Sequence, residues 1–116
     1  MIKEFLAEPD EAEQAADYHL KAFQAEGARI GEPISLVVKV SQIPEEKTSR
    51  VEARIREYFD CARLEKGMGG IPFFKQPTIH AYLKPMAFER ANLVASSESL
   101  YRLILDENVA VCLELA

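Results

Sequence analysis

Long apolar runs, cysteines and histidines are all scarce in this chain of 116 residues. The longest unbroken apolar run is the five residues from Val109 to Leu113, whereas a membrane-spanning helix needs about 20. The first residues include acids, where a secretory signal peptide needs bases and an apolar stretch. We therefore expect a cytoplasmic protein with no membrane partner.

The motifs of common catalytic and metal sites are missing. The two cysteines, Cys61 and Cys112, lie far apart in the sequence, so we expect reduced thiols rather than a zinc or redox pair. No His-Glu-x-x-His or Gly-x-Ser-x-Gly motif occurs. Gly67, Gly69 and Gly70 lack the Lys-Ser/Thr of a phosphate loop. We therefore assign no metal, no cofactor and no catalytic residue.

The charge argues against nucleic acid as a partner. The net charge is −5 and the pI is about 5.1, whereas nucleic-acid binding requires a basic surface. The acids are also unevenly placed. Residues 1–33 hold eight acids and three bases, while residues 34–116 hold eleven of each. We expect a single domain, 1–116, in which an acidic helical segment (1–33) precedes a neutral α/β body (34–116).

Hydrophobic periodicity and capping signals predict the elements of this domain. A helix is expected over residues 10–26, ending at Gly27, and a strand over 34–41. A long helix then ends at Gly67, and residues 67–77 form a Gly-rich loop. Strands follow at 78–84 and, more weakly, at 89–95, before a helix from Ser96 or Ser97 to Leu105 and a strand at 109–115. The competing interpretation places a helix over 85–92 and a strand near 73–75.

After the first helix, the order strand, helix, strand, strand, helix, strand is that of an α+β ferredoxin-like (βαββαβ) plait. Such a plait has both helices on one face of an antiparallel sheet. The opposite, open face is expected to be about half apolar and to need a cover. Its expected residues are Ser35, Val37, Lys39, Thr78, His80, Tyr82, Lys84, Arg90, Asn92, Val94, Ala110, Cys112 and Glu114. We expect a homodimer to provide that cover, together with the N-terminal helix.

The polar side chains of this face are the candidate ligand-binding residues. They are Lys39, His80, Tyr82, Lys84, Arg90 and Glu114. The resulting hypothesis is a binding module that holds a small molecule or a protein. One alternative is a cofactor-independent isomerase or lyase that uses His80 and Tyr82 as acid and base. Another is an acidic inhibitor or immunity-type protein that acts on a basic protein partner. His19 is interpreted as a core or interface histidine of the first helix.

Overall fold

The computed structural model describes residues 9–116. Its helices are α2 (Pro9–Ala25), α3 (Thr48–Tyr58) and α4 (Arg90–Glu107), with a 3-10 turn η1 (Glu45–Lys47) before α3. Its strands are β1 (Pro33–Ile34), β2 (Leu36–Ser41), β3 (Cys61–Gly69), β4 (Gln76–Leu83), β5 (Met86–Ala87) and β6 (Ala110–Leu115). The predictions of the first helix and of the strands at 34–41, 78–84 and 109–115 are confirmed with small changes of boundary.

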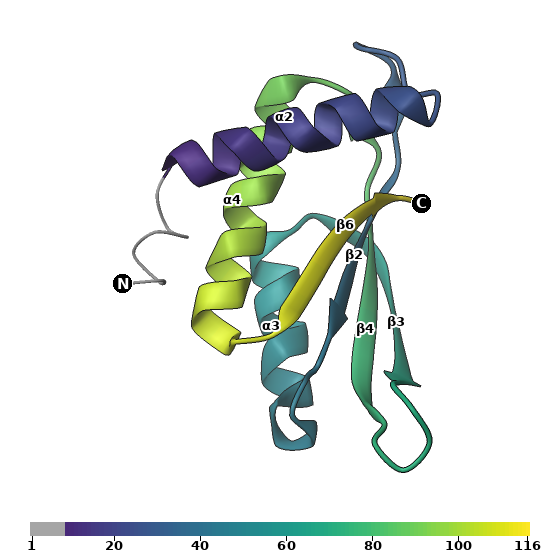
Figure 1. Cartoon of the computed structure of the whole chain (residues 1–116), viewed down its shortest axis with the longest axis vertical. Helices are drawn as coiled ribbons and strands as arrows, with labels where there is room; N and C mark the ends of the chain where they lie inside the picture. The colour runs from purple at the N-terminus through teal and green to yellow at the C-terminus, as the bar shows by residue number, and fades with distance from the viewer. Residues whose placement is uncertain (1–8) are drawn as a thin grey trace.

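The fold is α+β, with a four-stranded sheet in the order β3-β4-β2-β6. All neighbouring strands in this sheet are antiparallel. β1 and β5 form a separate two-stranded ribbon. Figure 1 shows α3 and α4 on the same side of the large sheet and α2 lying across α4. β6 is therefore an edge strand of this sheet, on the side nearer to α2.

The core lies between the large sheet and its two helices. Alternate residues of β2 and β4 face the helices and are buried, as their period-two pattern predicts: Leu36, Val38, Val40, Ile79, Ala81 and Leu83. The helices contribute Val51 and Ile55 from α3 and Leu93, Leu100 and Leu103 from α4. This burial is the main stabilising contribution to the domain.

The prediction of a helix up to residue 66 is wrong. α3 ends at Tyr58, and Phe59 has an extended backbone (φ −129°, ψ 149°). Cys61–Gly69 instead forms β3, which pairs with β4 along its length. β3 is an edge strand with few buried side chains, so its sequence lacks the apolar alternation that marks a half-buried strand. The Gly-rich loop is accordingly shorter than predicted.

The predicted strand over residues 89–95 is also wrong, because α4 already begins at Arg90. The proposed strand near residues 73–75 is absent as well. Leu93, Ser97 and Leu100 are buried at helical spacing on the core side of α4. As a result, Arg90, Asn92 and Val94 lie on this helix and not on the open face of the sheet.

A buried carboxylate joins α3 to α4. Glu107 is the last residue of α4, and its side chain is fully buried. Its Oε2 accepts a hydrogen bond of 3.0 Å from Arg50 Nε and lies 3.5 Å from Arg54 Nε. Both arginines belong to α3 and are partly exposed. The helix that was predicted to end at Leu105 therefore continues to Glu107, and Asn108 takes the left-handed conformation that ends it.

α2 is attached to α4 rather than laid over the open face of the sheet. Arg90 Nε donates to Asp17 Oδ1 at 2.8 Å, and the Tyr101 hydroxyl donates to the Glu11 carbonyl at 3.2 Å. Arg90 also lies 4.0 Å from Glu13, a second acid of α2. Glu4 and Glu8 lie outside the described residues. No helix within residues 9–116 has the length and apolar character needed to cross a membrane.

Candidate binding site

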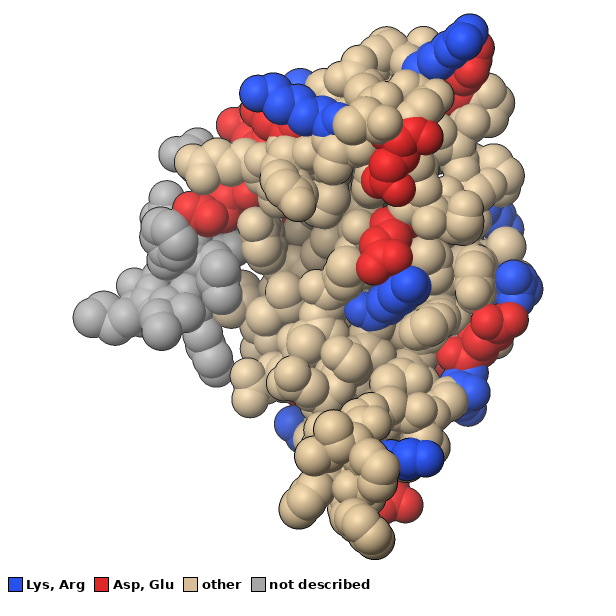
Figure 2. All heavy atoms as spheres, turned by 45° about the vertical axis from the view of Figure 1, so that its right-hand side comes forward, with Lys and Arg blue, Asp and Glu red and all other residues tan. Residues whose placement is uncertain are grey.

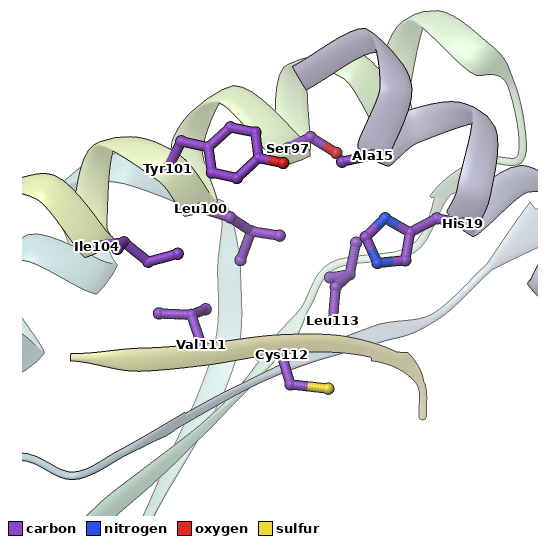
Figure 3. Close-up of a pocket in the computed structure, with 9 residues that line it drawn as sticks. All are labelled: Ala15, His19, Ser97, Leu100, Tyr101, Ile104, Val111, Cys112 and Leu113. Atoms are coloured by element: carbon purple, nitrogen blue, oxygen red, sulfur yellow. The ribbon is translucent and has the colours of Figure 1, made fainter. Parts of the chain in front are cut away.

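A pocket of about 250 Å³ lies between α2, α4 and β6. Figure 3 shows the ring of His19 extending from α2 toward this space, with Leu100, Tyr101 and Ile104 on the α4 side and Val111 below. Ala15, Ser97, Cys112 and Leu113 complete the lining. Most of these side chains are apolar, as is usual for sites that bind small molecules or single side chains.

Two polar atoms in this lining have no hydrogen-bond partner among the described residues. They are Ser97 Oγ and His19 Nδ1, and both are buried. The Ser97 side chain lies at the wall of the pocket toward Ala15 (Figure 3). An unpaired buried polar atom costs about 1–3 kcal/mol, so proteins usually pair such atoms or place them where a ligand pairs them.

The surroundings of His19 favour its neutral form. Its ring stacks on Phe23 and meets Tyr18 edge-on, each with a centroid separation of 5.5 Å. Burial lowers the pKa of His19, and the nearby Ala15 carbonyl only partly opposes this effect. The neutral ring offers one donor and one acceptor nitrogen, so the pocket is polar at this point without being charged.

A second pocket of about 310 Å³ adjoins the first and shares His19, Cys112 and Leu113 with it. Tyr18, Ala22, Phe23 and Glu26 of α2 line one side, and Glu114 and Leu115 of β6 line the other. Two of these lining residues are acids, whereas no described base lines the pocket. The two pockets follow each other along β6, the first toward its beginning and the second toward its end.

The candidate residues predicted from the sequence are divided between two places. Lys39, His80, Tyr82 and Glu114 lie on the open face of the sheet, where Lys39 is paired in register with His80 on one side and with Cys112 on the other. Lys84 directly follows β4, and its Nζ lies 3.4 Å from Asp60 Oδ1. Only Arg90 was placed wrongly, because it begins α4.

The open-face side chains interact with one another. Lys39 Nζ donates to Glu114 Oε1 at 2.9 Å, which raises the pKa of Lys39 and lowers that of Glu114. The Arg63 guanidinium lies 3.9 Å from the centre of the Tyr82 ring and also pairs with Glu65. Figure 2 brings this side of the molecule forward and shows basic and acidic side chains next to each other. Because these polar side chains are already paired with one another, the open face of the sheet has less need of a second chain to cover it.

Sequence reasoning missed several of these residues for identifiable reasons. Arg63 and Glu65 were assigned to a helix and were therefore not placed on the sheet. Ser97 was considered only as a helix cap, and Tyr101 was not considered at all. His19 was correctly expected at a packing interface, but the pocket beside it depends on how α2 crosses α4. Within residues 9–116, no three His, Cys, Asp or Glu side chains gather in a way that would hold a metal ion.

Comparison with protein-family models, with curated proteins and with solved structures found no match for this chain.

Proposed function

We propose that this chain is a non-catalytic binding module built on a ferredoxin-like plait. The support for this architecture is the order of the four long strands. The second strand (β3) lies beside the third (β4), the third beside the first (β2), and the first beside the fourth (β6). A helix connects the first strand to the second, and another connects the third to the fourth. This is the connectivity of a split βαβ unit.

The proposed binding site is the 250 Å³ pocket between α2, α4 and β6. The observation that carries this proposal is the pair of unpartnered, buried polar atoms, Ser97 Oγ and His19 Nδ1, in an otherwise mostly apolar lining. A ligand group that hydrogen-bonds to these atoms would recover the free energy that they lose in the empty pocket.

The lining also limits the chemistry of the ligand. A cavity of about 150 Å³ with an apolar lining binds benzene, so this pocket is large enough for an aromatic or branched aliphatic group. Neither Lys nor Arg is among the described lining residues, and the pKa of His19 is lowered. We therefore propose an uncharged apolar group that carries one hydrogen-bonding atom.

Phenol and toluene, which have nearly the same size, test this proposal. We expect amide chemical shifts around Leu100 and Val111 to move on titration with either compound, and phenol to bind more tightly. Ser97→Ala should weaken phenol binding about fivefold, as expected for one hydrogen bond of about 1 kcal/mol, and leave toluene binding unchanged. Ser99→Ala, on the same helix but outside the lining, is the matched control. Failure of both compounds to bind would refute the pocket.

The earlier hypotheses for the open face remain predictions. A homodimer through this face would bury the Lys39–Glu114 pair and the Arg63–Tyr82 contact. An enzyme using His80 and Tyr82 as acid and base would act through the Tyr82 hydroxyl, with the Arg63 guanidinium over the ring of that residue. Because the side-chain pairs on this face are already formed, the pocket beside β6 is the better supported site.

A further inference from the structure

On the outer edge of β6, the backbone groups at alternate positions pair with no other residue within 9–116. The Ala116 amide donates to the Ser35 carbonyl at 2.9 Å, which fixes the phase of the antiparallel β2–β6 ladder. Cys112 and Glu114 then exchange hydrogen bonds with β2, whereas the N–H and C=O groups of Val111, Leu113 and Leu115 point away from it. No described strand pairs with this outer edge.

The two pockets open onto this edge and not only onto one face of the sheet. Successive side chains of a strand point to opposite faces, so a pocket on one face would contact only every second residue. The first pocket is instead lined by three consecutive residues, 111–113, and the second by four, 112–115. Space is therefore available beside the backbone of β6, where a fifth strand would lie.

We propose that β6 binds an extended basic polypeptide segment as an added strand, with alternate side chains of that segment in the two pockets. Main-chain hydrogen bonds to Val111, Leu113 and Leu115 would hold the segment, and the pockets would select its side chains, as in other cases of strand addition. This inference rests on the proposed function, because it identifies the group in the first pocket as a side chain of a protein partner.

The lining of the pockets specifies the side chains. The first pocket is apolar and takes an aromatic or branched aliphatic side chain. The second is lined by Glu26 and Glu114. The carboxylate of Glu114 is already paired with Lys39, so Glu26 is the acid that favours Lys or Arg there. Side chains two residues apart in a strand are about 6.8 Å apart on the same face, which suits adjoining pockets.

The test uses the full chain and the peptide acetyl-Thr-Lys-Thr-Phe-Thr-Lys-Thr-amide, which places Lys two residues from Phe in either direction. In the free protein, we expect fast hydrogen exchange at the amides of Val111, Leu113 and Leu115 and slow exchange at Cys112 and Glu114. Saturating peptide should slow exchange at the first three amides at least fivefold. Phenol should leave their exchange unchanged, because it fills a pocket without pairing with the strand.

Two controls separate strand addition from simple side-chain binding. One control peptide is N-methylated at the Phe and Lys amides, and the other is N-methylated at the Thr amides. In an extended strand these two sets of main-chain donors point to opposite edges. One set should weaken binding at least tenfold and the other should have little effect. Equal effects of the two sets would overturn the proposal. Phenol binding without peptide binding would also overturn it, while leaving the proposed pocket intact.

The basic preference has its own test on the protein. Glu26→Lys should weaken peptide binding at least fivefold, because it reverses a charge at the second pocket. Glu32→Lys makes the same change in net charge at an exposed site outside both pockets and should have little effect. Equal effects would contradict the assignment of the Lys side chain to this pocket. Slow exchange at Val111 and Leu113 in a dimeric free protein would show that a second copy occupies the edge, and would also overturn the proposal.

Discussion

At the scale of single residues, polar atoms inside apolar surroundings are the most informative feature of this protein. Ser97 Oγ, His19 Nδ1 and Glu107 Oε1 are buried without a partner among the described residues. The other carboxylate oxygen of Glu107 accepts a hydrogen bond from Arg50, so this side chain helps to hold α3 against α4. Ser97 and His19 line the same pocket, which is why we propose that they hydrogen-bond to a ligand there.

The lowered pKa of His19 predicts a pH dependence of stability. The unfolded state, with a histidine pKa of about 6.5, binds a proton at a higher pH than the folded state does. The free energy of unfolding should therefore fall as the pH drops below about 6.5, and the loss is complete below the folded-state pKa. Urea unfolding between about pH 7.5 and pH 5 measures this effect. His19→Gln should flatten the profile, and an unchanged slope in this variant would contradict the assignment.

At the scale of elements, the position of α2 determines whether the pocket exists. The helix is held by packing of Phe23 near Phe88, with ring centroids 6.4 Å apart, and by the pair between Asp17 and Arg90. Arg90 also lowers the pKa of Asp17 through their hydrogen bond. This part of the site therefore depends on a contact between residues that are distant in the sequence.

A double-mutant cycle tests the electrostatic part of this attachment. Arg90→Gln and Asp17→Asn should show a small favourable coupling in the free energy of unfolding, because the pair is well formed but exposed. The coupling should shrink at high salt. The same cycle on Lys84 and Asp60, which are 3.4 Å apart and more exposed, should give a smaller coupling. A larger coupling for Lys84 and Asp60 than for Arg90 and Asp17 would show that the distance and exposure of a pair do not determine its coupling.

At the scale of the whole molecule, exposed apolar side chains gather at one end. Of the six large exposed hydrophobic residues within 9–116, four lie in the β3–β4 connection and its flank: Met68, Ile71, Phe73 and Phe74. Figure 1 shows this connection extending beyond the rest of the sheet. These side chains contribute little to the core, so replacing them should leave the fold intact.

The double substitution Phe73→Ser with Phe74→Ser tests this separation. Because Phe73 is 98% exposed and Phe74 is 74% exposed, we expect the free energy of unfolding to change by less than about 0.5 kcal/mol. Concentration-dependent self-association, measured by sedimentation velocity, should decrease because an apolar patch is removed. The control Phe88→Ser changes a fully buried ring and should cost at least about 3 kcal/mol. A large loss of stability in the double variant would contradict this view of the hairpin end.

Strong local patterns were enough to predict much of the fold. Leu36, Val38 and Val40 alternate with less apolar residues, and this strand was predicted within two residues of its ends. The errors fell where local signals were weak or misleading. β3 has few buried residues on either face. The apolar residues within 90–95 fit both the period of a strand and the period of a helix. Of the predicted site residues, Lys39, His80, Tyr82 and Glu114 share a face as expected, whereas Arg90 lies on α4.

The sequence by itself determined the class of the domain, because the period of its apolar residues and its turn residues are local properties of the chain. It also determined that the acids concentrate near the N-terminus. Only the tertiary structure decided which strand is an edge and where α2 lies. Those features depend on contacts such as Asp17 with Arg90 and Cys61–Gly69 with β4. A pocket formed by three such elements leaves no periodic trace in the sequence, because its lining residues are brought together only by packing.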